Sequence, residues 1–426
     1  MLHQHMFSRF IYSIKNNPFD FVYFLFYVGI LATLGMVLVN PDEALKIFIF
    51  STALSLPLIG KNLKHVCSNK KNLVLPFMLL LFGLLQIFWV EIFKQPGSAF
   101  TGAYRSYQNG GKVMLFAALV MTALTSRAPC ANKARITSIW VIVTAIGLYL
   151  YAGYQLFGAA KPLNYRVTLG FEHPTGAAYG LTFIALLASQ SILNLRLKHA
   201  VSLYFLHFLL SLAVMVTTQT RAAILVYPIL SIGLFFIYYR HNRRMLLRAL
   251  LAFIILGGLV TIPLKSVIEA RYQNLMTDLY SYSQSNSNTS IGARFAMQQV
   301  GIMAGNAHLW GQSLEQRDAE IKAFALQNIT MQGALAYVDI HLHNEIIDTF
   351  SLKGIPGVIV LFLLYTAMFL KAYWQRSPLL FVISGAIAIY GLSDLLLYAK
   401  GEALSSVLAL CIAAILSSQS NERTMP

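Results

Sequence analysis

Long apolar runs recur along almost the whole chain, and they limit its fold more than any other feature. A helix needs roughly 20 mainly apolar residues to cross the hydrocarbon core of a bilayer. We therefore predict an all-α, polytopic membrane protein in which lipid surrounds most of the chain. About twelve runs approach this length, at residues 21–39, 44–59, 73–90, 113–124, 136–157, 175–193, 201–216, 222–239, 249–264, 355–370, 379–398 and 403–416.

The composition agrees with a membrane protein. Hydrophobic residues make up 57% of the chain and charged residues 11%, whereas soluble domains carry roughly a quarter charged residues. The net charge of +16 would suggest a nucleic-acid partner in a soluble protein. Here the positive-inside rule explains it, so we expect no nucleic acid. Residues 1–18 precede no small-residue processing site, so we expect the first run to remain as a membrane helix.

Lysine and arginine clusters occupy every second connection between the runs. The positive-inside rule places such clusters in the cytoplasm. The sequence thus predicts a multi-pass protein of the bacterial inner membrane with both termini in the cytoplasm. The clusters are Lys61, Lys64, Lys70 and Lys71; Arg127, Lys133 and Arg135; Arg196 and Lys198; Arg240, Arg243, Arg244 and Arg248; Lys371 and Arg376; and Arg423.

One long polar stretch falls on the predicted periplasmic side, between the ninth and tenth runs. Within it, residues 280–290 are rich in Ser and Asn and predict a loop. Residues 292–303 and 319–326 have helical spacing, which is compatible with helices along the membrane surface. The predicted domains are a membrane bundle of spans 1 to 9 at 1–264, a large periplasmic loop subdomain at 265–343, and spans 10 to 12 at 344–426.

Several cations lie on the predicted outer side, where the positive-inside rule does not account for them. Arg221 occupies the tip of a tight hairpin between two membrane runs, Arg166 a short outer loop, and Arg294 the start of a helix in the large loop. Arginine offers planar paired donors that match phosphate oxygens, and it stays charged when partly desolvated. The three could converge on one anion site. Alternatively, each anchors a helix end at the headgroups or pairs with a local carboxylate.

The segment DIHLHNE at residues 339–345 holds the best candidate base in the chain. Histidine accepts a proton near neutral pH, and a nearby carboxylate or carbonyl can fix its tautomer. Because His341 and His343 are two residues apart, we expect only one to face the site; both could instead cap the helix start. A zinc site built from these histidines and Glu345 has no second cluster to complete it. Asp394 falls in the eleventh run, where a carboxylate needs a partner and could simply hold the bundle together.

These short motifs, taken together and in order, resemble the O-antigen ligases of enteric bacteria. They are TQTRA at 218–222, GAR at 292–294 and HLHNE at 341–345, with YRSY at 104–107 and TGAAY at 175–179. The resemblance implies a metal-independent, inverting glycosyltransferase of the GT-C-like membrane class without a cofactor. Its donor would be a glycan linked to undecaprenyl diphosphate, and its acceptor a terminal sugar of the lipid A-core oligosaccharide. Membrane lipids would surround it.

The resemblance also assigns roles to single residues. Arg221 and Arg294 match the family's essential arginines, and His343, directly before Asn344, matches its catalytic histidine. In the mechanism that we expect, His343 takes a proton from an acceptor hydroxyl, which attacks the anomeric carbon opposite the diphosphate while arginines stabilise the leaving group. Further candidates for substrate binding are Arg166, Arg105, His341 and Glu345.

Two other functions stay open on the sequence alone. An O-antigen polymerase would use the same donor but a second lipid-linked glycan as acceptor. A flippase or transporter for lipid-linked glycans would line a path across the bilayer with cations. The arginines named above lie on one predicted side, which favours a one-sided enzyme site over a transport path.

Overall fold

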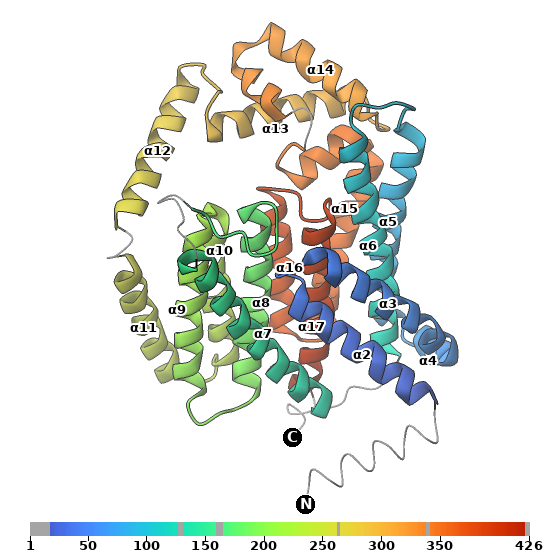
Figure 1. The fold of residues 1–426 in the computed structure, drawn as a ribbon, viewed down its shortest axis with the longest axis vertical. Helices are drawn as coiled ribbons and strands as arrows, with labels where there is room; N and C mark the ends of the chain where they lie inside the picture. The colour runs from blue at the N-terminus through green and yellow to red at the C-terminus, as the bar shows by residue number, and fades with distance from the viewer. Residues whose placement is uncertain (1–17, 127–130, 159–164, 262–264, 338–340, 422–426) are drawn as a thin grey trace, which may run out of the picture.

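The computed structural model is helical throughout the residues it describes, and no strand occurs in them (Figure 1). These residues are 18–126, 131–158, 165–261, 265–337 and 341–421. The elements are α2 (Pro18–Met36), α3 (Pro41–Lys61), α4 (Leu63–Ser68), α5 (Lys70–Phe93), α6 (Thr101–Thr125), α7 (Ala131–Phe157), α8 (Pro174–Asn194), α9 (Ala200–Thr218), α10 (Arg221–Tyr238), α11 (Arg243–Thr261), α12 (Lys265–Ser283), α13 (Ser290–Ala307), α14 (Leu314–Gln327), η1 (Ile329–Tyr337), α15 (Glu345–Trp374), α16 (Pro378–Gly391) and α17 (Lys400–Asn421).

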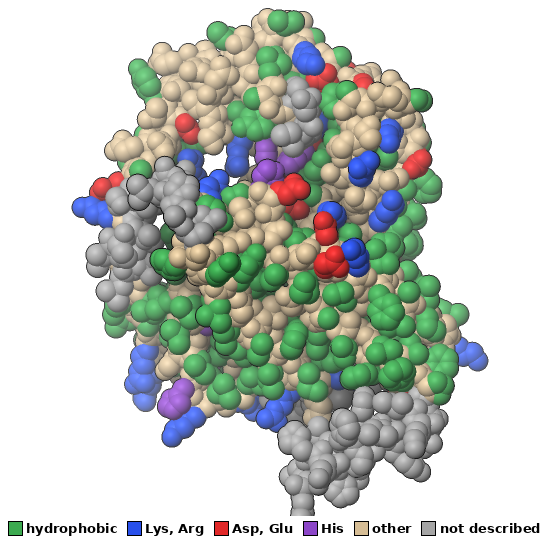
Figure 2. All heavy atoms as spheres, viewed as in Figure 1, with side chains coloured by type: hydrophobic (Ala, Val, Ile, Leu, Met, Phe, Trp, Pro, Cys, Tyr) green, Lys and Arg blue, Asp and Glu red, His purple; other side chains and the backbone are tan. Residues whose placement is uncertain are grey.

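The prediction of an all-α, polytopic membrane protein is confirmed. Among the described residues, nine helices are long and apolar enough to cross a membrane, and α16 is apolar but shorter. Figure 2 shows a broad band of hydrophobic side chains across the visible face of the bundle, as expected for a surface that faces lipid. The total of twelve spans stays a prediction.

Helix α8 is the centre of the bundle. Every residue from Gly176 to Leu193 is buried, and the helix packs against α7, α9, α10, α16 and α17. Small residues allow this close packing: a Cβ added at Gly180 would lie 2.4 Å from a methyl carbon of Leu38. Helices further out bury one side and expose apolar side chains on the other, as α10 does with Leu225 and Ile229.

Helices α12, α13 and α14 lie together at one end of the bundle, which we call the loop end (Figure 1). The two helices predicted within the long polar stretch are confirmed as α13 and α14. Each begins at a side-chain cap: Thr289 Oγ1 accepts from the N–H of Gly292 at 3.1 Å, and Ser313 Oγ accepts from the N–H of Gln316 at 3.0 Å. The predicted loop is shorter than expected, because α12 continues to Ser283.

Helix α6 begins at Thr101, twelve residues before the predicted run at 113–124. Two further boundaries that differ from the sequence prediction matter for the site. Helix α15 begins ten residues before the tenth apolar run, because Asn344 Oδ1 caps the N–H groups of Ile346 and Ile347 at 3.1 and 3.2 Å. It kinks at Gly354, whose φ of +62° favours glycine. Helix α16 ends at Gly391, so the prediction that Asp394 lies inside a membrane helix is wrong.

The leucines that follow α16 explain this error. Leu395, Leu396 and Leu397 are buried by the protein itself, in a non-helical segment that connects α16 to α17. An apolar run does not distinguish burial in lipid from burial in protein. The Asp394 carboxylate accepts the N–H of Leu395 at 2.9 Å, which replaces a helical hydrogen bond locally.

Candidate functional site

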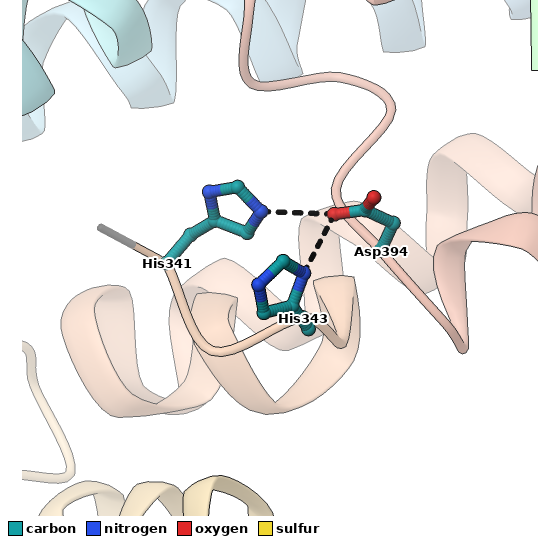
Figure 3. Close-up of side chains that lie close together, drawn as sticks. All are labelled: His341, His343 and Asp394. Carbon is teal, nitrogen blue, oxygen red and sulfur yellow. Dashed lines mark hydrogen bonds and ion pairs between the residues drawn. The ribbon is translucent and has the colours of Figure 1, made fainter. Parts of the chain in front are cut away.

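Two histidines share one carboxylate oxygen at the loop end (Figure 3). His341 Nε2 lies 2.8 Å and His343 Nδ1 lies 3.1 Å from Asp394 Oδ1. The two imidazole centroids are 4.5 Å apart. Both rings therefore turn toward the same carboxylate, although the sequence led us to expect only one histidine in the site.

Asp394 is the anion of this cluster. Burial would raise the pKa of Asp394, but the hydrogen bonds from His341 and His343 together outweigh burial and hold that pKa well below its usual range. The carboxylate is therefore ionised at neutral pH and accepts a hydrogen from each ring. With its Nδ1 hydrogen held by Asp394, His343 keeps the lone pair on Nε2, the atom that a proton acceptor needs.

Contacts of Leu342 fix the backbone between the two histidines. The N–H of Leu342 donates to Asp348 Oδ1 at 3.1 Å, and the Leu342 side chain is buried against α13. His343 has a φ of +47°, a left-handed conformation that few residues with a side chain adopt. Such a conformation persists only where its surroundings over-determine it. The direction of the His343 imidazole is thus set by the main chain.

Asp348 binds three donors from different parts of the fold. Besides the N–H of Leu342, it accepts from Arg317 Nη1 at 2.8 Å and from the Tyr107 hydroxyl at 2.5 Å. The side chains of Arg317 and Asp348 are both 0% exposed. Arg317 belongs to α14 and Tyr107 to α6, so this buried ion pair attaches the loop-end helices to the membrane bundle beside the histidines.

Two of the predicted arginines lie beside the turn between α9 and α10. Arg166 Nε donates to the carbonyl of Thr218 at 2.9 Å, which holds its loop against that turn. Arg221 is the first residue of α10, three positions further along. The N-terminus of a helix attracts anions through its free N–H groups and its dipole. The turn thus combines side-chain and main-chain donors at the loop end.

Arg294 belongs to α13, the helix that lies over the loop end (Figure 1). Its side chain is exposed. Figure 2 shows Lys and Arg side chains beside His side chains around a hollow beneath α12 and α13. In the described part of the chain, neither Arg221 nor Arg294 forms an ion pair with a carboxylate.

The remaining two candidates lie apart from the hollow. Arg105 lines a small pocket on the outer surface of α5 and α6, with Glu91 and Lys94. Glu345 is buried, and both its oxygens are bonded within the protein: Oε1 accepts the N–H of Leu397 and Oε2 accepts the Tyr365 hydroxyl, each at 2.8 Å. Glu345 therefore holds the segment that carries Asp394 against α15.

The histidine cluster also has the donor atoms of a metal site. One ligand atom each from His341, His343 and Asp394 lie within 4.8 Å of one another. Three protein ligands would suffice for a catalytic zinc ion. Glu345, the third ligand considered from the sequence, points away. The same atoms are satisfied by hydrogen bonds among the three side chains, and the predicted absence of a metal stays a prediction.

Sequence reasoning missed three residues that build the site. Asp394 was assigned to a span, and Arg317 and Asp348 are 31 positions apart in sequence. Asp348 did carry a usable signal. A carboxylate four residues after the Asn344 cap, next to an apolar run, requires a buried partner.

Comparison with known proteins shows which proteins have a similar sequence. A family described as O-antigen ligase matches residues 206–362. An O-antigen ligase of Escherichia coli is 30% identical over 400 residues, which cover 92% of this chain and 93% of that protein. An uncharacterized protein of Haemophilus influenzae is 26% identical over 234 residues, or 51% of this chain and 57% of that protein. The family match includes Arg221, Arg294 and both histidines of the cluster.

Proposed function

Because the chain belongs to the O-antigen ligase family, we propose that it transfers an O-antigen glycan from undecaprenyl diphosphate to lipid A-core. The acceptor would be a terminal sugar of the core oligosaccharide. One arrangement carries the proposal: Asp394 holds the imidazole of His343 at the loop end, where Figure 2 shows His side chains beside a hollow surrounded by basic side chains. A proton acceptor and an anion site side by side are what glycan transfer from a lipid diphosphate requires.

The reaction would be a single displacement. His343 Nε2 takes the proton of the acceptor hydroxyl, and the oxygen forms a bond to the anomeric carbon of the donor. The bond from that carbon to the diphosphate oxygen breaks, and the electron pair leaves with the lipid diphosphate. Attack from the opposite face inverts the anomeric configuration. No metal takes part in this scheme.

The arginines would act mainly on the departing group. Charge increases on the diphosphate as the glycosidic bond breaks, and preorganised donors stabilise that charge more in the transition state than in the bound donor. Arg221 at the start of α10 and Arg294 on α13 are suited to this task because neither is neutralised by a carboxylate in the described residues. Arg166 already donates one hydrogen to Thr218 and would contribute less.

Asp394 would position the imidazole and stabilise its charged form. The Nδ1 hydrogen of His343 points at Asp394, so the carboxylate lies next to the positive charge that forms when Nε2 takes a proton. His341 donates to the same oxygen and would limit the rotation of the carboxylate.

We place the loop end in the periplasm and the opposite end in the cytoplasm of the inner membrane. Exposed arginines at the junction of α10 and α11, among them Arg240 and Arg244, lie at the end opposite the histidine cluster. The positive-inside rule puts that end in the cytoplasm. The polar stretch at 265–343 would then form the periplasmic subdomain.

Reconstitution tests the proposal directly. Purified protein in nanodiscs receives lipid-linked glycan and lipid A-core without nucleotide, and capped lipid A-core is measured. We expect product from the unmodified protein and a loss of about 10²- to 10⁴-fold in His343→Asn, the usual contribution of a general base. His65→Asn is the matched control, because His65 is an exposed histidine outside the site, on α4.

Three results would overturn the proposal. Undiminished transfer by His343→Asn removes the imidazole from the chemistry. Extension of the lipid-linked glycan in place of transfer to lipid A-core identifies a polymerase. Movement of the lipid-linked glycan across the membrane without any product identifies a flippase.

A further inference from the structure

A second group of cations lies at the loop end of α5 and α6. Lys94 follows α5, and Arg105 and Lys112 lie two turns apart on one side of α6. Lys94 and Arg105 line a pocket together with Val90, Glu91 and Gln108. We call Lys94, Arg105 and Lys112 the α5–α6 cation group.

Glu91 lines the same pocket, so the three cations outnumber its one carboxylate. Glu91 accepts a hydrogen bond from Gln108 Nε2 at 2.9 Å, and Lys112 Nζ donates to Gln108 Oε1 at 3.2 Å. No ion pair joins Lys94, Arg105 or Lys112 to a carboxylate in the described residues. Two exposed lysines elsewhere are paired: Lys46 lies 2.7 Å from Glu43, and Lys322 lies 2.7 Å from Asp318.

The backbone next to Arg105 also favours an anion. Arg105 follows the first turn of α6, and the N-terminus of a helix attracts negative charge and disfavours a cation. The positive-inside rule gives no reason for cations at this end of the bundle. A bound anion would satisfy both the side chains and the helix end.

The cation group lies at the edge of the lipid-facing surface. On α5, Phe88 is 58% and Ile92 is 72% exposed, within two turns of Lys94. Apolar side chains that are this exposed face lipid in a membrane protein, so the cations that follow them lie at the depth of lipid headgroups. Figure 2 shows basic side chains directly above the hydrophobic band on the right-hand side of the view.

Helix α15, which follows the histidine cluster, lies between α10 on one side and α5 and α6 on the other (Figure 1). In Figure 2, Lys and Arg side chains lie on both sides of the His side chains near the hollow. Helix α6 connects the two regions, because Arg105 faces the outer pocket while Tyr107 binds Asp348. Two anionic groups could therefore approach His343 from opposite sides.

We propose that the α5–α6 cation group binds the phosphates of the lipid A headgroup of the acceptor. This inference rests on the proposed ligase function. Lipid A is a phosphorylated disaccharide with fatty acyl chains, so its phosphates would pair with Lys94, Arg105 and Lys112 through charge-assisted hydrogen bonds. Its acyl chains would lie along the lipid-facing side of α5. The core sugar would then reach His343 from the side opposite the donor.

The test compares acceptor kinetics with and without the phosphates. The triple variant Lys94→Gln, Arg105→Gln, Lys112→Gln is assayed in phosphatidylcholine nanodiscs with intact or dephosphorylated lipid A-core. We expect KM for the intact acceptor to rise about tenfold or more, because losing one hydrogen bond to a charged group changes affinity by roughly that factor. We expect kcat and KM for the lipid-linked donor to stay unchanged. Unmodified protein with dephosphorylated acceptor should show the same raised KM.

Two controls isolate the site. The double variant Lys46→Gln, Lys322→Gln also removes exposed cations, but each of these lysines is already paired with a carboxylate. It should leave every KM unchanged. The single variant Arg105→Gln, which removes one exposed side chain, should give an intermediate KM and covers the case in which the triple variant is poorly folded.

Three outcomes would overturn the inference. One is an unchanged KM for the intact acceptor in the triple variant. Another is an equal rise in KM for the dephosphorylated acceptor. The third is a defect that appears only when phosphatidylglycerol is added, which would indicate a site for bulk anionic lipid. Failure of the proposed ligase function looks different, because unmodified protein would then cap neither acceptor.

Discussion

Arginines at the loop end occur in two opposite environments. Arg317 is fully buried and bonded to Asp348, which is itself fully buried. Arg221 begins α10 and Arg294 belongs to α13, both at the loop end, and neither has a carboxylate partner among the described residues. A guanidinium taken out of water must be paired, because its desolvation is otherwise not compensated. An arginine that is left unpaired beside a hollow remains able to bind an anion from outside.

The comparison shows that the residue type and the side of the membrane do not define a role. Arg317 falls in the predicted periplasmic stretch at 265–343, so all three arginines lie on the predicted outer side, where the positive-inside rule explains none of them. The difference lies in their surroundings. Arg317 is buried and holds α14 against α15, whereas Arg221 and Arg294 would be available to a diphosphate. The two kinds should respond differently to mutation, one through stability and the other through turnover.

The largest expected effect is on stability, at the buried pair. Arg317→Met leaves the Asp348 carboxylate buried without its partner and should destabilise the protein by about 3–5 kcal/mol. The double variant Arg317→Met, Asp348→Asn removes both charges and should recover most of that loss. Thermal unfolding in detergent measures both. If Arg317→Met melts at the temperature of the unmodified protein, Arg317 does not stabilise the fold in the way that we infer.

A slightly smaller effect is expected on turnover, at the hollow. Arg221→Lys retains the charge but not the planar pair of donors, so kcat should fall by about 10²- to 10³-fold, the usual loss for one transition-state donor. The melting temperature should stay unchanged because the Arg221 side chain has no buried partner. Equal kcat in Arg221→Lys and the unmodified protein would show that charge alone suffices there.

The smallest of these effects is expected at Asp394, which shares features of both classes. It is mostly buried like Asp348, yet it holds the histidines that would do the chemistry. In Asp394→Asn the neutral amide can still accept one hydrogen bond but no longer stabilises a charged imidazole. We expect kcat to fall by about 10- to 100-fold, as for other residues that orient a catalytic group. KM for both substrates should stay the same, and a change confined to KM would contradict a positioning role.

Much of the membrane architecture could be predicted from the sequence. Apolar runs of membrane length and alternating basic connections depend on local composition, so most helices of the bundle were placed close to their observed bounds. The start of α6 was placed twelve residues too late, because its first turns are polar. The ends of α15 and α16 were misplaced, because the Asn344 cap and the burial of Leu395 to Leu397 depend on tertiary contacts. The same limit hid Asp394 from the candidate site.

Only part of the candidate site could be predicted from the sequence. His341, His343, Arg221 and Arg294 could be named because they occur in short motifs. Their mutual arrangement could not be derived, because Asp394 approaches His343 from 51 positions away. The role of Arg317 was likewise hidden, since an outer arginine with a buried partner and one without look the same in a sequence.

Helices α12 and α13 pass over the hollow, which is open to the surroundings (Figures 1 and 2). An open chamber imposes no upper size on what projects from it, unlike an enclosed cavity that must fit its whole substrate. Only the sugar next to the diphosphate would have to enter, while the rest of the polymer extends outward into the aqueous space. The proposed transfer should therefore proceed at one rate for short and long glycans.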